Sequence, residues 1–540
     1  MKTFQLKNIA LFIVLLTACK QEPIVPQEQT VTPDTSCQDA TKGSADFTKF
    51  VAVGSSYTAG FQAGALFTDG QNNSLPAILN KQFQCVGASA TFNQPTIGSA
   101  LGYNIFVSPN PDANNHIFGR FLLEYNGASS PTPTPQLSTI AALPNPAANP
   151  SFIFGDGSEK ASLNNFGIQA IVLGQALIPQ TGDWSGAGTD PRFNPFYGRL
   201  AYPGTGSTLI GDAAAAGGTF FMLWLGMDDF MLYAVYGGDA KLAPLTSSSD
   251  FAGEYGAAVG AMLSPPNSPK GVLGNFPDIF AMPHFTSVGY NPIPLDASTA
   301  AAVNTGFAGY NAALGALIAN ASAFGVSSQL AAELNTRMVS FAAVSNNRIL
   351  IMDETLTNLG PYFDELEGAG AITANQRAQL TPYQQVRQTT SSDIIPLATG
   401  SILGTLVNND PTLVNGVSVP LADRYAITPS ERDSINAARN SFNATVSGAV
   451  LANPTRLALG DVNTFMGTIN ANQAAIRNNI TVTPNINPPT GMYSEDGLHP
   501  NSRGYAFISI AFINGINDAF GATVPPTDIS LYSATALPIP

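Results

Sequence analysis

The segment Phe47-Thr-Lys-Phe-Val-Ala-Val-Gly-Ser-Ser-Tyr-Thr-Ala-Gly60 joins an apolar run to a cluster of hydroxyl-bearing residues. The apolar run, Phe50 to Val53, stops at Gly54, and two serines follow at once. This pattern predicts a buried strand that ends in a tight polar turn. Such a turn holds a serine at the rim of a sheet, where it is useful for chemistry only if a histidine takes its proton and a carboxylate holds that histidine.

The chain has three histidines, His116, His284 and His499. Only His499 has a carboxylate placed to hold it, because Asp496 stands three residues upstream in the segment Ser494-Glu-Asp-Gly-Leu-His-Pro-Asn-Ser-Arg-Gly-Tyr505. If Pro500 opens a helix, Asp496 and His499 lie in the turn before it, and the carboxylate can reach Nδ1. We therefore expect the two ends of the chain to share one site.

Two sequence blocks resemble those of the SGNH (GDSL-like) hydrolases. They are Gly54-Ser-Ser-Tyr57 near the beginning and Asp496-Gly-Leu-His499-Pro500 near the end. The resemblance implies an α/β fold, a three-layer α/β/α sandwich with a parallel flavodoxin-like sheet, and the activity of a serine esterase or lipase. It also implies that Ser56 is the nucleophile, His499 the base and Asp496 its orienting partner.

Two internal segments resemble the middle blocks of the same family, but the residues that bind the oxyanion differ. Asn164-Asn-Phe-Gly-Ile-Gln-Ala170 resembles the second block, whose glycine N–H binds the oxyanion; this position falls on Ala170, with Gly167 as the alternative. Leu225-Gly-Met-Asp-Asp229 resembles the third block, but Asp228 replaces the asparagine whose amide donates to the oxyanion. Ser55 also stands where the family signature has aspartate.

These changes bear on activity, because losing one oxyanion donor typically costs about 10²–10³ in turnover. Either Asp228 is protonated and donates, or the neighbouring N–H groups of Ser56 and Ala170 suffice, or the site is impaired. The expected substrate is an ester on a lipid or an acylated carbohydrate. The alternative function is a binding protein for an acylated glycan or lipid that keeps the fold and has lost turnover.

The N-terminus predicts a secreted, anchored protein. Residues 1–18 have a basic beginning and an apolar middle, as in a signal peptide. Leu16-Thr-Ala-Cys19 resembles a bacterial lipobox, which implies lipidation of Cys19 and attachment to a membrane without crossing it. The polar residues after it resemble those of Bacteroidetes lipoproteins, which implies the outer membrane of the cell envelope. Residues 19–44 are rich in Pro, Gln and Thr and predict a flexible tether.

Composition excludes several other classes. The net charge of −14 becomes two units more negative when the signal peptide is removed, so nucleic acid is an unsuitable partner. No second apolar run reaches the roughly 18 residues of a membrane span. Scattered histidines and the lack of a phosphate-binding loop predict neither a metal nor a cofactor. Cys37 and Cys85 either form one disulfide or remain two separate thiols.

Apolar runs and helical periodicities alternate along the chain, which predicts a parallel sheet covered on both faces. Strands are expected at 220–225, 278–282, 348–352 and 456–460, and helices at 296–320 and after the capping box Thr428-Pro-Ser-Glu431. One domain, 45–525, carries insertions near 62–162 and 361–427 that form a cap, and 526–540 is a tail. The segments 131–135 and 141–150 are expected to be too proline-rich for regular structure. His284 and Tyr290 lie in a segment that either lines an acyl pocket or packs under the cap.

Overall fold

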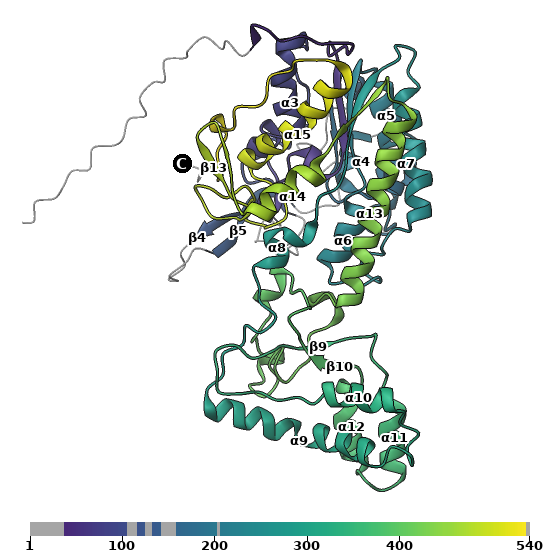
Figure 1. Ribbon diagram of the computed structural model, residues 1–540, viewed down its shortest axis with the longest axis vertical. Helices are drawn as coiled ribbons and strands as arrows, with labels where there is room; N and C mark the ends of the chain where they lie inside the picture. The colour runs from purple at the N-terminus through teal and green to yellow at the C-terminus, as the bar shows by residue number, and fades with distance from the viewer. Residues whose placement is uncertain (1–36, 105–115, 125–131, 142–157, 202–205, 536–540) are drawn as a thin grey trace, which may run out of the picture.

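The computed structural model describes residues 37–104, 116–124, 132–141, 158–201 and 206–535 (Figure 1). The predicted signal peptide, Cys19 and most of the tether lie outside these ranges. Within them, no helix has both the length and the apolar character needed to cross a bilayer.

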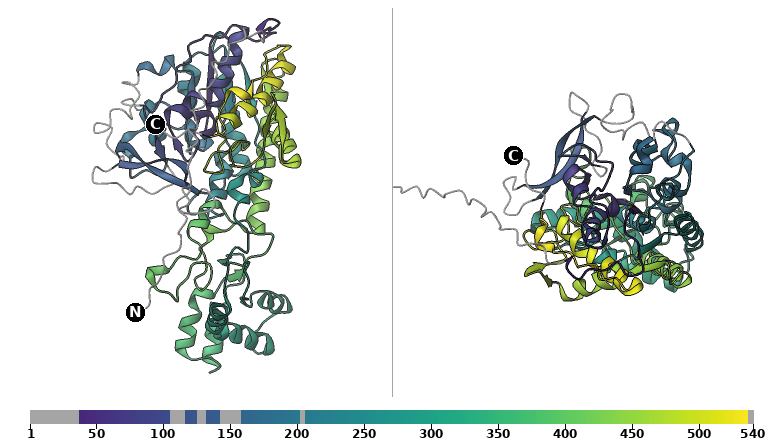
Figure 2. Two further views of the ribbon diagram at one scale, coloured as in Figure 1. Left: turned by 90° about the vertical axis from the view of Figure 1, so that its left-hand side faces the viewer. Right: turned by 90° about the horizontal axis from the view of Figure 1, so that it is seen from above.

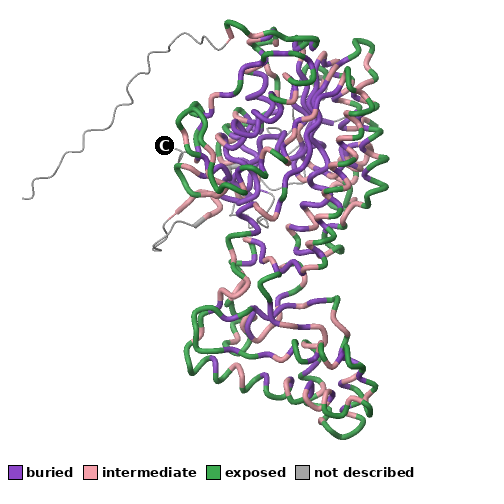
Figure 3. The backbone as a smooth tube through the Cα atoms, in the orientation of Figure 1, coloured by how far each residue is buried: buried purple, intermediate pink, exposed green. Residues whose placement is uncertain are grey.

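A five-stranded parallel sheet forms the centre of the larger lobe. Its spatial order is β11 (Leu457–Gly460), β8 (Lys270–Gly274), β7 (Phe220–Trp224), β1 (Phe50–Gly54) and β6 (Asn165–Gly167). Nearly every residue of these strands is buried, as expected for parallel strands covered on both faces (Figure 3). The α/β fold and the apolar runs at β1, β7 and β11 are therefore confirmed.

Two groups of helices cover the sheet. The first group comprises α3 (Leu75–Phe83), α14 (Val462–Asn472) and α15 (Ser502–Phe520). The second comprises α5 (Leu209–Ala215), α6 (Asp228–Val235), α7 (Ser248–Leu263) and α13 (Pro429–Ala452). Because α13 and α15 both pack on β11 but within different groups, the arrangement is compatible with three α/β/α layers (Figure 1).

The predicted strand at 278–282 is wrong. The Asp278 side chain accepts a hydrogen bond from the Phe280 N–H at 3.1 Å and caps a 3-10 turn, Ile279–Ala281. The strand lies upstream at Lys270–Gly274. This segment contains two glycines and only two apolar side chains, Val272 and Leu273, which is too short a run for a clear signal. The capping box at Thr428 is confirmed, since the Glu431 carboxylate accepts from the Thr428 N–H at 2.7 Å at the start of α13.

A second lobe with its own apolar core projects from the larger one (Figures 1 and 2). Its core residues run from Ile293 to Ala426, so this insertion is much longer than the predicted 361–427. The strand predicted at 348–352 exists as β9 (Leu350–Met352), but it pairs antiparallel with β10 (Val386–Gln388) and is not part of the parallel sheet. The lobe also contains α9 (Ala297–Ala319), α10 (Ser328–Thr336), α11 (Gly360–Gly368) and α12 (Ala374–Leu380).

The predicted insertion at 62–162 is divided between core and surface. Helix α3 belongs to the main core and packs against α15. Strands β4 (His116–Glu124) and β5 (Thr132–Ala141) form a separate hairpin. The expectation of irregular structure at 131–135 is wrong for Pro133 and Pro135, which lie in β5, because a two-stranded ribbon leaves each strand an outer edge that needs no N–H donor. Residues 142–150 lie outside the described ranges.

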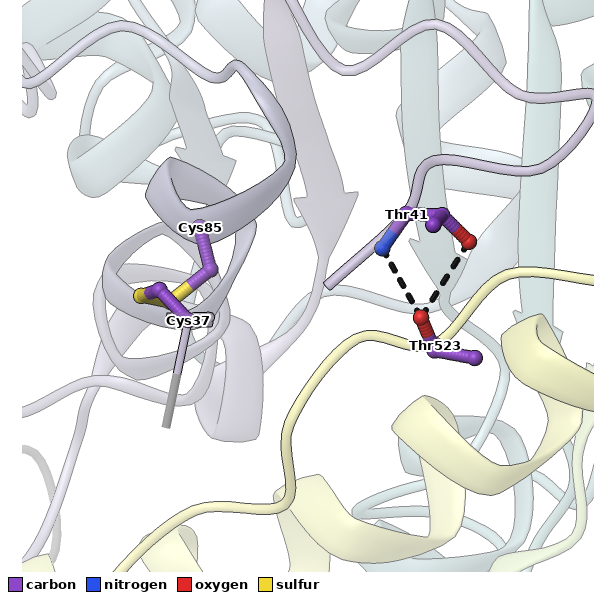
Figure 4. Close-up of a disulfide and its surroundings, with 4 residues drawn as sticks. All are labelled: Cys37, Thr41, Cys85 and Thr523. Atoms are coloured by element: carbon purple, nitrogen blue, oxygen red, sulfur yellow. Dashed lines mark hydrogen bonds between the residues drawn. A yellow bond between two sulfur atoms is a disulfide. The ribbon is translucent and has the colours of Figure 1, made fainter. Parts of the chain in front are cut away.

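Both ends of the described chain are attached to the main lobe. Cys37 and Cys85 form a disulfide, and the Thr41 N–H donates to Thr523 Oγ1 at 2.8 Å (Figure 4). The tether is therefore shorter than the predicted 19–44. At the other end, the amide of Asn501 donates to the Ala534 carbonyl oxygen at 2.6 Å, so the described part of the predicted tail, 526–535, packs on the domain.

Candidate active site

The turn before α15 holds the predicted carboxylate and histidine together. Asp496 Oδ2 accepts a hydrogen bond from His499 Nδ1 at 2.9 Å, and Oδ1 accepts from the His499 backbone N–H at 2.8 Å. The Gly64 N–H, from the other end of the chain, also donates to Oδ2 at 2.8 Å. Burial opposes ionisation, but His499 and these donors hold the pKa of Asp496 below its ordinary value. The helix begins at Ser502, two residues later than Pro500, because Asn501 caps it.

The His499 ring lies between two aromatic rings that follow β1. The ring centroids of Tyr57 and Phe61 are 5.3 and 4.8 Å from that of His499. The Tyr57 hydroxyl donates to the Leu498 carbonyl oxygen at 2.5 Å. Because Tyr57 directly follows Ser56, these contacts bring the histidine to the carboxyl end of β1, where Ser56 begins helix α1 (Ser56–Ala59). Both Ser56 and His499 are buried.

An amide group points at the predicted nucleophile. The Ala170 N–H donates to Ser56 Oγ at 3.4 Å. Ala170 has φ 50°, a left-handed conformation that favours glycine, as expected for a position that resembles a family glycine. The N–H of Gly167, the alternative donor, is already bonded to Asn165 Oδ1 at 2.9 Å. The geometry therefore favours Ala170.

Asp228 follows β7 and faces the same region. Its Oδ2 accepts from the Ile171 N–H at 3.2 Å, whereas Oδ1 is buried and has no hydrogen-bond partner among the described residues. Burial and the neighbouring Asp229 raise the pKa of Asp228 to about 8, although Ile171 and the Ser55 hydroxyl oppose part of this rise. At neutral pH the carboxyl group is therefore mainly protonated, and Oδ1 can carry a proton to donate.

Asp229 has a different role from its neighbour. The Leu173 N–H donates to its Oδ2 at 2.8 Å, and the Thr246 hydroxyl donates to its Oδ1 at 2.9 Å. Oδ2 thus holds the segment after β6 against the start of α6, and Oδ1 holds the segment before α7 there. Of the two adjacent acids, Asp228 is the one that has a carboxyl oxygen without a hydrogen-bond partner among the described residues.

A cavity of about 340 Å³ borders Ala170. Aromatic and amide side chains dominate its wall, among them Tyr103, Phe193, Phe196, Gln169 and Asn194. Gln169 was not predicted. Its side chain is fully buried, yet neither amide atom has a hydrogen-bond partner within the described ranges. A buried amide without a partner costs about 1–3 kcal/mol.

His284 supports the turn that holds Asp496 and His499 and is not among the residues that line this cavity. Its backbone N–H donates to the Gly497 carbonyl oxygen at 3.0 Å, and its Nδ1 lies 3.3 Å from the Asp496 carbonyl oxygen. Burial lowers the pKa of His284 to about 4, so the ring is neutral at physiological pH. Of the two roles considered for this segment, packing is the one that the contacts favour.

The residues predicted from the two ends and the middle of the chain thus meet at one edge of the sheet. Ser56, Ala170 and Asp228 follow the adjacent strands β1, β6 and β7, and the turn of Asp496 and His499 packs against them. Comparison with known proteins adds nothing to this geometry, because no family model, curated protein or solved structure matches the chain.

Proposed function

We propose that this protein is a serine ester hydrolase of the SGNH (GDSL-like) type. The observation that carries the proposal is the buried Asp496–His499 pair packed against Tyr57, next to a serine whose Oγ faces the Ala170 N–H. The strand order supports it: counted along the chain, the strands stand in the order 2-1-3-4-5, which is that of flavodoxin-like sheets. Ligands of such sheets bind at the carboxyl ends of the strands, where the order reverses.

In the proposed reaction, Ser56 Oγ attacks the ester carbonyl carbon while His499 takes the hydroxyl proton, and Asp496 stabilises the imidazolium. The N–H groups of Ser56 and Ala170 and the protonated Asp228 donate to the oxyanion. The intermediate then collapses, and the alcohol leaves with the proton from His499. Water, activated by the same histidine, hydrolyses the acyl-enzyme and restores Ser56.

The two departures from the family pattern support a working site when they are considered together. Ser55, which replaces an aspartate, lies near Asp228, which replaces an asparagine, and its hydroxyl lowers the pKa of the Asp228 carboxyl group. Compared with the family pattern, position 55 loses a carboxyl group and position 228 gains one. Protonated Asp228 then provides an O–H donor where the family has an N–H donor.

A binding protein without turnover is the second candidate function. The observation that favours it is the burial of both Ser56 and His499, which are 3% and 1% exposed. A substrate carbonyl must reach Ser56 Oγ for hydrolysis, whereas a ligand in the adjacent cavity needs no such access. Hydrolysis of any ester that depends on Ser56 excludes this alternative.

For the substrate, we propose an acylated carbohydrate. The cavity of about 340 Å³ is at the lower end of the range for small-molecule sites, roughly 300–1,000 Å³. Its aromatic rings can pack on the apolar faces of a sugar, and its amides can bind the hydroxyl groups. A long alkyl chain cannot form hydrogen bonds with a buried amide.

Ser56→Ala and His499→Ala should each abolish hydrolysis of p-nitrophenyl esters and acetylated sugars while leaving the far-UV circular dichroism unchanged. The reason is that one change removes the nucleophile and the other removes its base. Ser55→Ala is the matched control and should keep the fluorophosphonate label on Ser56. Full activity of Ser56→Ala, or labelling at Ser55 in the wild type, would remove the assignment.

Asp228→Asn should raise turnover most at alkaline pH. With a pKa of about 8, only about a tenth of wild-type Asp228 is protonated at pH 9, so the variant should be about tenfold faster there and little changed at pH 6. The pH–rate profile should show a descending limb near pH 8 in the wild type alone. Identical profiles would mean that Asp228 is not at the oxyanion.

A stability measurement checks the same pKa without substrate. A carboxyl whose pKa is raised on folding contributes stability that is complete below about pH 4, its unfolded pKa, and is lost as pH rises through its folded pKa. Wild-type stability should therefore fall between about pH 4 and 8 relative to that of Asp228→Asn. Urea unfolding of both proteins at several pH values gives this difference, which includes the effect of Asp228 on the neighbouring Asp229.

Gln169→Leu should lower kcat/KM for the cognate ester about tenfold, through KM, without lowering stability. Its amide has no protein partner to lose, so an apolar replacement of similar size is neutral or stabilising in the free protein. Gln175→Leu is the matched control, because Gln175 lines the same cavity but accepts a hydrogen bond from the Val172 N–H at 3.2 Å. If Gln169→Leu unfolds more easily and binds substrate normally, the amide is structural.

Cys19→Ser should leave an unprocessed precursor that lacks the lipid-dependent mobility shift, because we propose the Cys19 thiol as the site of acylation. Metabolic labelling with a fatty acid, followed by membrane fractionation, measures this directly. Cys37→Ser serves as the control and should remain lipidated. Normal maturation of Cys19→Ser would show that the lipobox interpretation is wrong.

A further inference from the structure

Three carboxylates converge where the second lobe joins the larger one. Glu354 follows β9 in the second lobe, Asp423 lies in the 3-10 turn Asp423–Tyr425 on the returning chain, and Glu431 is in the first turn of α13. Each offers one oxygen, and these oxygens all lie within 4.8 Å of one another. Figure 1 shows this junction between β9 and the end of α13.

One member of the group is buried and has an oxygen without a partner. Glu431 is 4% exposed; its Oε2 accepts hydrogen bonds from the N–H and hydroxyl of Thr428, both at 2.7 Å. Its Oε1 has no hydrogen-bond partner among the described residues, and the same holds for Asp423 Oδ1. A charge with a spare buried oxygen is costly unless a cation or donor neutralises it.

No protein cation supplies that neutralisation. The nearby arginines are engaged elsewhere: Arg387 pairs with Asp353 and Asp393 at 2.6 Å, Arg432 pairs with Asp433 at 3.4 Å, and Arg424 donates to the Tyr425 hydroxyl at 2.6 Å. Within the described ranges, no ion pair includes any of the three clustered acids. Burial and the neighbouring Glu354 and Asp423 raise the pKa of Glu431 to about 8, so the cluster holds protons that a divalent cation would displace.

The spacing fits a divalent cation with oxygen ligands. Ca²⁺ binds oxygens at about 2.3–2.6 Å, so two of its ligands on opposite sides are at most about 5 Å apart, and those on one side are closer. Glu431 can keep its capping role through Oε2 while Oε1 turns to a cation. Backbone carbonyl groups and water complete the six to eight ligands in such sites.

We propose that Glu354, Asp423 and Glu431 bind a calcium-type divalent cation that joins the second lobe to the larger one. The inference does not depend on the proposed esterase activity, because it rests on the junction and is tested by binding. Since Glu354 lies in the second lobe, Asp423 on the returning chain and Glu431 in α13, occupancy fixes the lobe relative to the core.

The test is titration of the chelator-treated protein with CaCl₂ by isothermal calorimetry, with MgCl₂ in parallel, and thermal unfolding at each concentration. We expect one Ca²⁺ per chain, with Kd no weaker than about 1 mM, as in extracellular modules, and a rise in Tm with Ca²⁺ concentration. If Mg²⁺ binds more tightly than Ca²⁺, the calcium assignment is wrong and the site binds magnesium.

Glu431→Gln and Asp423→Asn should each weaken Ca²⁺ binding by on the order of 10- to 100-fold. Glutamine keeps the acceptor of the capping box, so Glu431→Gln should remain folded. Glu365→Gln, at an exposed acid on α11, is the matched control and should bind as the wild type does. Absence of both heat and a Tm shift at 10 mM CaCl₂, or wild-type affinity in both ligand variants, would overturn the proposal.

Discussion

The site and the closure of the fold both depend on the carboxylate of Asp496. Its two oxygens accept hydrogen bonds from the turn in which it lies and from Gly64, more than four hundred residues upstream. A buried carboxylate needs several hydrogen-bond donors to stay ionised. The turn before α15 and the segment after β1 therefore stabilise each other through Asp496. The same contacts set the tautomer and direction of the His499 ring. The geometry of the candidate site and the long-range closure of the fold therefore depend on one hydrogen-bond network.

Burial raises the pKa of both Asp496 and Asp228 at this edge of the sheet, but the net shifts have opposite directions. Asp496 has enough donors to stay ionised in spite of it, whereas Asp228 has too few and takes up a proton. The contrast follows from local hydrogen bonding, since both side chains are almost completely removed from water. Two carboxyl groups with pKa values moved in opposite directions are what a hydrolytic site uses as an anion and as a donor.

What the sequence could predict was local. The β1 run, the capping box of α13 and the Asp496–His499 contact each span a few residues, and short-range geometry determines them. The second lobe could not be predicted in the same way, because β9 is three residues long and its partner β10 lies more than thirty residues further on. The importance of Gln169 was equally hidden, since nothing in its local sequence distinguishes an unpartnered amide from a bonded one. The strand expected at 278–282 failed because the Asp278 side chain competes for the backbone.

The disulfide also determines how the domain would carry tension. A force applied to the chain upstream of Cys37 is transmitted through the Cys37–Cys85 bond to the segment that ends α3. The stretch from Cys37 to β1 then carries little of that force. Force therefore bypasses β1, the strand that ends at Ser56. The path of such a force and the candidate site therefore use different elements of the same lobe.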